Sequence, residues 1–175
     1  MQNHLLKEKT AAKFKEFLTK ATDEELILTE KILNGLQQKQ QNHYVTYLDA
    51  LCQMTSQISD DSYEVIIPIQ PLIYNKLDIV HGGITATLAD TAMGSYISKL
   101  LPENKSGVTT ELKINYLAPG KGKFLKCTAA IIHKGKQLWV AEAKIYNDSG
   151  KLAAVATGSF YIVTRTDYSK NTKND

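Results

Sequence analysis

The chain has 175 residues, a length typical of one domain that carries an appendage. Apolar residues make up 43% and charged residues 22%, as in an ordinary globular protein that buries a sizeable core. The formal net charge is only +3, too small to indicate a nucleic-acid partner. The charged N-terminus lacks a hydrophobic signal core, and no run of about 18 apolar residues occurs, so we expect a cytoplasmic protein without membrane contacts.

The cysteines and histidines do not have the spacing of metal ligands. Cys52 and Cys127 lie far apart in no CxxC or CxxH pattern, which favours two reduced, buried thiols. His4, His43 and His133 are equally scattered. We therefore expect neither a metal ion nor another cofactor.

Residues 1–43 are expected to form a helical extension. One apolar stripe runs from Leu5 to Leu18, and a second segment opens with Thr22 and Glu25 in the spacing of a capping box. Such a pair of helices could bind a partner or DNA, or could stabilise an oligomer or form a lid. We favour the second interpretation because the pair is too short for a winged-helix domain and its basic residues alternate with acidic ones.

From residue 44 to residue 164 the pattern indicates an α+β domain, followed by a flexible polar tail at 165–175. Turn sequences such as PGKG, KG and DSG separate the later strands. We expect the strands to form one antiparallel meander sheet wrapped around a single long helix, which would explain why that helix is apolar on nearly all sides. The expected strands are 51–58, 62–71, 107–119, 123–135, 136–148 and 151–163, with the helix at 80–101.

Asp90 is the only charged residue between Gly82 and Ser98, within this helix. A carboxylate in apolar surroundings costs several kcal/mol unless it is paired or hydrogen-bonded. Two interpretations are open: Asp90 acts in catalysis, or it bonds a nearby hydroxyl or backbone group and locks the packing.

The sequence His81–Gly82–Gly83 stands where the helix begins. Backbone N–H groups in a first helical turn lack partners within the helix, and glycine leaves them open to a ligand. Such a place suits the oxyanion that develops during acyl transfer.

The spacing of these two features favours a dimer. Gly82 and Asp90 are eight residues apart, roughly 12 Å along a helix, so one carbonyl group cannot reach both. Either the features are unrelated, or a second copy of the helix brings its Asp90 beside the first copy's Gly82. We prefer the second option, which implies composite sites in a two-fold dimer.

The HGG sequence, followed by TLAD with its acid nine residues after His81, resembles the hotdog-fold thioesterases of the phenylacetate-degradation type. The segment VTTELKINYLAPGKG is also similar to the third strand of that family. The resemblance covers roughly residues 50–163 and leaves out the N-terminal helices. It implies a hotdog fold, an acyl-CoA substrate, and a homodimer or a dimer of dimers.

The resemblance also implies roles for individual residues. Asp90 would be the catalytic nucleophile or base, and the Gly82 N–H would polarise the thioester carbonyl, with Gly83 beside it. Asn75 would help to position water or the carbonyl, and Thr109 would supply a hydroxyl near the acid. The residue we read as mainly structural is His81, which would hold the loop to the helix start.

Lysines after Pro119 are candidates for the phosphates of coenzyme A, chiefly Lys121 and Lys123, although solubilising turns use the same residues. Tyr116 and Trp139 are expected to pack rather than bind. The sequence thus predicts an acyl-CoA thioesterase. Two alternatives are open: an acyl-CoA sensor that binds without cleaving, and a hotdog dehydratase, which would need a histidine and an acid at the same carbon.

Overall fold

The computed structural model describes residues 2–59 and 61–165, so the expected tail lies outside the described residues from position 166 onward. The chain divides into two compact units, with the boundary in the sequence between Leu51 and Cys52. None of the described helices combines the length and the apolar character that crossing a membrane requires. The domain boundaries expected from the sequence, an extension at 1–43 and an α+β domain at 44–164, stay a prediction.

The N-terminal unit consists of α1 (Gln2–Leu18), α2 (Asp23–Gln40) and α3 (Tyr47–Cys52). The capping box is confirmed: the Glu25 N–H donates to Thr22 Oγ1, and the Thr22 N–H donates to Glu25 Oε2. A second box, formed by Thr46 and Asp49, begins α3. The prediction of a strand from residue 51 is therefore wrong over its first half, because this second box starts a helix.

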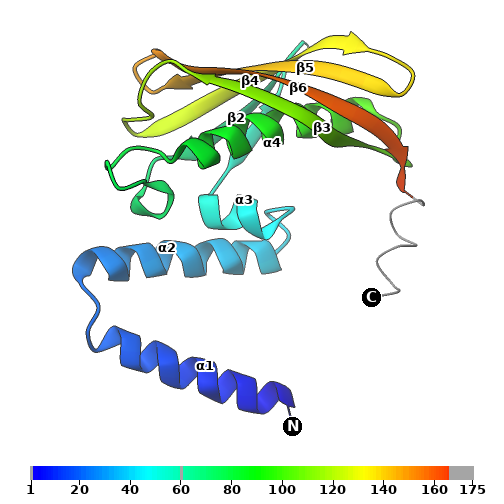
Figure 1. The fold of residues 1–175 in the computed structure, drawn as a ribbon. Helices are drawn as coiled ribbons and strands as arrows, with labels where there is room; N and C mark the ends of the chain where they lie inside the picture. The colour runs from blue at the N-terminus through cyan, green and yellow to red at the C-terminus, as the bar shows by residue number, and fades with distance from the viewer. Residues whose placement is uncertain (1, 60, 166–175) are drawn as a thin grey trace. The chain divides into compact units, whose positions relative to one another are not determined.

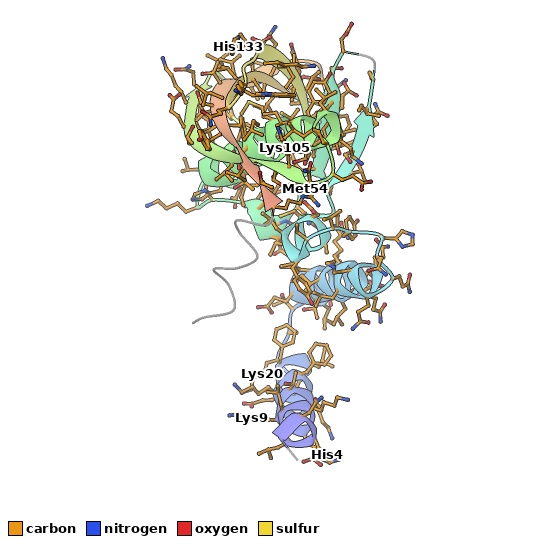
Figure 2. The ribbon with its side chains drawn as sticks, turned by 90° about the vertical axis from the view of Figure 1, so that its right-hand side faces the viewer. His4, Lys9, Lys20, Met54, Lys105 and His133 are labelled. Carbon is orange, nitrogen blue, oxygen red and sulfur yellow. The ribbon has the colours of Figure 1, made fainter. Side chains whose placement is uncertain are left out.

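Gly35 is the buried residue of α2, and it lies against the backbone of α3. A Cβ at this position would collide with the carbonyl oxygen of Ala50, so only glycine allows the two helices to approach so closely. The Lys39 ammonium also lies 5.5 Å from the centre of the Tyr47 ring. By contrast, Lys9 and Lys20 project from α1 and from the turn after it (Figure 2).

The second unit contains a six-stranded antiparallel sheet in the order β1-β2-β4-β5-β6-β3 (Figure 1). The expectation of a simple meander is wrong for one strand: β3 pairs with β6 at the edge of the sheet instead of with β4. The other pairs join neighbours in this order. The strands are β1 (Thr55–Ile58), β2 (Tyr63–Pro68), β3 (Lys105–Tyr116), β4 (Phe124–Lys134), β5 (Leu138–Asn147) and β6 (Leu152–Thr164).

Helix α4 (Gly82–Leu100) lies against the concave side of this sheet (Figure 1). Its buried stripe includes Leu88, Met93 and Ile97, all without solvent exposure. Small residues on the strands, such as Gly158, let the helix come close, since a Cβ there would lie 3.1 Å from Met93 Cε. The predicted architecture, an antiparallel sheet around one central helix with helices before it, is confirmed.

Both cysteines are buried, as expected. Burial raises the pKa of the Cys127 thiol to about 12, so it stays protonated at neutral pH. Cys127 is therefore a core residue of β4 rather than a reactive group.

A hydrogen-bonded carboxylate joins β1, β2 and β4 on the face of the sheet turned away from the core. Glu64 accepts hydrogen bonds from Gln57 Nε2 at 2.6 Å and Thr128 Oγ1 at 3.2 Å, and pairs with Lys126 Nζ at 3.1 Å. The Gln57 bond is the largest cause that holds the pKa of Glu64 below its usual value, followed among the favourable contacts by Lys126 and Thr128. The charged form of Glu64 is thus favoured in the folded protein.

This arrangement predicts a pH-dependent contribution to stability. Because the pKa is lower in the folded than in the unfolded state, the contribution is present above the unfolded value near 4.5 and is lost as pH falls through the folded value. Glu64→Gln should lower the free energy of unfolding at pH 7 by about 1 kcal/mol, and by less at pH 4. Urea denaturation at both pH values measures this. Glu142→Gln, in an exposed pair at 3.8 Å, is the control and should change little. Equal losses for the two variants at pH 7 would contradict the assignment.

Candidate active site

A cavity of about 490 Å³ opens at the first turn of α4. Its walls are the loop before the helix, which includes Asn75, the first turn itself, and residues 116–120 at the end of β3. The lining is mainly aliphatic and carries few polar groups, a composition usual for a binding site for an organic ligand.

The first four N–H groups of α4 differ in whether they have a hydrogen-bond acceptor. His81 is the N-cap, and its carbonyl accepts from Ile84 and Thr85 at 2.9 and 3.1 Å. The Gly83 N–H donates to His81 Nδ1 at 2.9 Å. The Gly82 N–H, in contrast, has no acceptor within residues 2–59 and 61–165. Since Gly82 lines the cavity, a single donor at the positive end of the helix is left open there.

This pattern also defines the state of His81. Because Nδ1 accepts a hydrogen bond, the proton of the neutral ring is on Nε2. The His81 ring thus caps the first turn of α4 by accepting the Gly83 N–H, which agrees with a structural role.

Asn75 faces the cavity from a tight turn. Its Oδ1 accepts from the Leu77 N–H at 2.8 Å, and its backbone exchanges hydrogen bonds with Asp78 and Ile79. The turn uses the oxygen of the side chain, so the amide nitrogen is the atom that Asn75 can offer to a ligand. The backbone bridge between Tyr74 and Val80 ties this loop to the helix start.

Asp90 is half-buried, and a hydroxyl group lies within hydrogen-bond distance of its carboxylate. Thr109 Oγ1, from β3, donates to Asp90 Oδ1 at 2.8 Å. A charge-assisted bond of this kind fixes the orientation of the carboxylate. Oδ2 then remains for a reacting molecule.

A β-bulge places Thr109 beside the acid. Leu112 and Ile114 face the helix, so strict alternation would turn Thr109 to the opposite side of the sheet. The register shifts between Thr109 and Glu111, and Thr109 pairs instead with the buried Phe160. Because paired residues share a face, the bulge brings Thr109 to the side of Asp90.

The two halves of the predicted site are not brought together within one chain. The cavity is lined by Gly82, Gly83 and Asn75, but among the described residues its walls include neither Asp90 nor Thr109. The helical rise separates Gly82 from Asp90 by roughly 12 Å. A single copy of the chain thus holds a donor half and an acid half apart.

The loop between β3 and β4, here called the lysine loop because it carries Lys121 and Lys123, lies next to the donor half. Lys121 and Lys123 are both exposed, and Gly120 before them lines the cavity. Asp148 holds the loop by accepting the Lys123 N–H at 3.0 Å, and its side chain fills the space where a Cβ of Gly122 would lie. Gly122 has φ of +112°, which glycine adopts without strain.

Tyr116 is a site residue that sequence reasoning missed. The expectation that it packs is wrong, because the residue is 53% exposed, lines the cavity and donates from its hydroxyl to the Gly82 carbonyl at 2.8 Å. The alternation of β3 gave the only available signal, since it turns Tyr116 to the helix side like Leu112 and Ile114. Trp139 does pack against the core, and its Nε1–H donates to Gly135 O at 2.9 Å.

The acidic, histidine and cysteine side chains of the described segments form no group of three that could hold a metal ion.

Comparison with known proteins identifies the family. Residues 77–154 match the model of the thioesterase superfamily. A Bacillus halodurans protein, whose crystal structure was determined with CoA, is 46% identical, with a TM-score of 0.82 over 87% of this chain and 99% of that one. The chain belongs to the thioesterase superfamily. The resemblance to hotdog thioesterases is thereby confirmed.

Two curated relatives of this thioesterase-superfamily chain match over shorter regions. A putative esterase of Saccharolobus solfataricus is 37% identical over 51% of this chain, and acyl-coenzyme A thioesterase 13 of Mus musculus is 39% identical over 46%. The matches span 59% and 58% of those relatives' own length.

The bond between Thr109 and Asp90 gives a prediction for thioester hydrolysis. Thr109→Val keeps the shape of the side chain but removes the hydroxyl that orients the carboxylate, so kcat should fall roughly tenfold. Thr109→Ser keeps the hydroxyl and is the matched control. Steady-state kinetics with an acyl-CoA thioester measures the difference, and equal kcat values for the two variants would contradict the role of the hydroxyl.

Proposed function

We propose that the protein is an acyl-CoA thioesterase that hydrolyses a thioester to a free acid and coenzyme A. The observation that carries this proposal is the open N–H of Gly82 at the cavity, the one donor of the first helical turn that its surroundings leave without an acceptor among the described residues. A backbone donor at a helix N-terminus stabilises the negative charge that develops on a thioester carbonyl oxygen. Family membership and the CoA bound to the Bacillus halodurans relative support the substrate class.

The complete site is proposed to form between two copies of the chain. β3 is an edge strand of 12 residues that pairs on one side with β6 and, within the part of the chain that the structure describes, with no strand on its other side (Figure 1). Antiparallel pairing of two β3 strands about a two-fold axis would extend the sheet and align the two α4 helices in opposite directions. Asp90, hydrogen-bonded to Thr109 of this edge strand, would then approach the partner's Gly82.

In the proposed reaction, the thioester carbonyl oxygen accepts a hydrogen bond from the Gly82 N–H, and Asn75 Nδ2 orients the attacking water or the carbonyl. The other subunit's carboxylate, Asp90, removes a proton from the water as its oxygen attacks the carbonyl carbon. The carbon–sulfur bond then breaks, and coenzyme A leaves as a thiolate that needs no strong general acid. Alternatively, Asp90 attacks directly to form a mixed anhydride, which water opens to release the acid and restore the carboxylate.

The lysine loop is proposed to meet the phosphates of coenzyme A. Lys121 and Lys123 are exposed beside the mouth of the cavity, where ammonium groups can bind phosphate as point charges. The aliphatic lining would contact the acyl or pantetheine part of the substrate. Assignment to the phenylacetate-degradation type rests on the HGG–TLAD spacing, and the cytoplasmic location stays an expectation.

Asp90→Asn tests hydrolysis against simple binding. The amide keeps an oxygen for Thr109 but can neither accept the proton of water nor attack, so thiol release should fall at least 100-fold, with a melting temperature equal to or above that of the wild type. Thiol release from a panel of acetyl-, hexanoyl-, lauroyl- and phenylacetyl-CoA measures turnover. Retained turnover in the variant would reject the role of Asp90. A wild type that binds these thioesters without cleaving them would instead be a sensor.

Mixing two inactive variants tests the composite site. Gly82→Pro deletes the donor, and the position suits proline because it is the first residue of α4 and His81 before it has ψ of 134°. In a mixed dimer with Asp90→Asn, one of the two sites keeps both wild-type groups, so random mixing should restore about a quarter of wild-type activity. Gly82→Ala, which keeps the N–H and places a Cβ 3.4 Å from the Tyr116 ring, is the control and should lose less activity than Gly82→Pro. No recovery in mixtures that exchange subunits would show that the site is not shared.

A further inference from the structure

The peptide group between Gly82 and Gly83 is held at both of its polar atoms. Its N–H, on Gly83, donates to His81 Nδ1 at 2.9 Å. Its carbonyl, on Gly82, accepts from the Tyr116 hydroxyl at 2.8 Å. The preceding peptide group is also held, because its carbonyl, on His81, accepts from the Ile84 and Thr85 N–H groups. Both peptide planes that meet at the Gly82 Cα are thus fixed from outside that residue.

This fixation matters because α4 begins weakly. Two consecutive glycines have more backbone freedom than any other pair, and the first turn has no acidic residue to complement the helix dipole. Histidine is also not among the preferred N-cap residues. A donor that stabilises an oxyanion must nevertheless be oriented before the reaction begins, since a displacement of about 1 Å can cost a hundredfold in rate.

The position of Tyr116 suits this task and not a packing role. It is the last residue of β3 and pairs with Ala154, whose small buried side chain leaves room for the ring to extend over the start of α4. Ring atoms lie 3.4 Å from the place that a Cβ of Gly82 would take. The residue is 53% exposed and is not part of the buried core, whereas its hydroxyl makes a well-formed hydrogen bond.

We propose that Tyr116 is a positioning residue of the thioesterase site: through its bond to the Gly82 carbonyl it fixes the backbone of Gly82, so that the open N–H points at the thioester carbonyl oxygen. This inference rests on the proposed function, and it adds a residue from the end of β3 to the residues of the donor half. Tyr116 acts on the backbone donor and takes no part in proton transfer.

Tyr116→Phe tests the inference because it removes the hydroxyl and keeps the ring. We expect kcat for the best wild-type substrate of the acyl-CoA panel to fall about tenfold while KM changes less than twofold, since the donor acts mainly in the transition state. Tyr161→Phe, an exposed tyrosine on β6, is the matched control and should keep the wild-type kcat. Equal kcat values for the two variants, or a raised KM with unchanged kcat, would overturn the inference, the latter because it indicates direct contact with the substrate.

A second measurement separates this inference from the proposed function. The chain has 10 glycines, so labelling with ¹⁵N-glycine gives few amide signals to follow. The amide hydrogen of Gly83 should exchange with solvent at least fivefold faster in Tyr116→Phe, and at the wild-type rate in Tyr161→Phe. If the wild type cleaves no thioester of the panel, the proposed function fails, and the exchange rates still decide whether Tyr116 fixes the peptide. Unchanged exchange in Tyr116→Phe would overturn the inference whatever the activity.

Discussion

The rigid rise of α4 is the constraint on which the candidate site depends. One helix carries both the backbone donor at Gly82 and the carboxylate of Asp90, and its geometry keeps them roughly 12 Å apart. The structure surrounds each end separately: the cavity, Asn75 and Tyr116 gather at the donor, while Thr109 holds the acid beside the open edge of β3. Since one helix cannot bring its own two groups together, a second α4 helix running in the opposite direction would supply the missing group at each site.

A single strand, β3, supplies a neighbour to both groups: Thr109 to Asp90, and Tyr116 to Gly82. β3 begins near the C-terminal end of α4, passes the acid at Thr109 and ends over the helix start at Tyr116. Its position at the sheet edge leaves Asp90 half-buried instead of enclosed by other strands. The strand that orients both groups is therefore also the strand with free backbone groups for pairing, which links the geometry of the site to assembly.

The hydrophobic core fixes the position and the rotation of α4. Small residues on the strands, such as Gly158 and Ala156, allow α4 to lie close to the sheet, and the apolar stripe with Leu88 and Met93 fixes its rotation. Rotation of the helix decides which residues face β3. A stable core thus determines where Asp90 points, although no core residue takes part in the chemistry.

The sequence by itself determined most of the elements, though not α3, together with the single central helix, the capping box at Thr22 and the family. Periodicity, turn residues and the HGG–TLAD spacing are local patterns. It also singled out Asp90 and Gly82, as a charge and glycines are unusual in such a helix. Only the tertiary structure decided that β3 pairs with β6, that a bulge turns Thr109 toward the acid, and that Tyr116 bonds to Gly82. Those features arise from contacts between residues 19 to 59 positions apart, and a bulge inverts the alternation from which a local pattern infers the facing side.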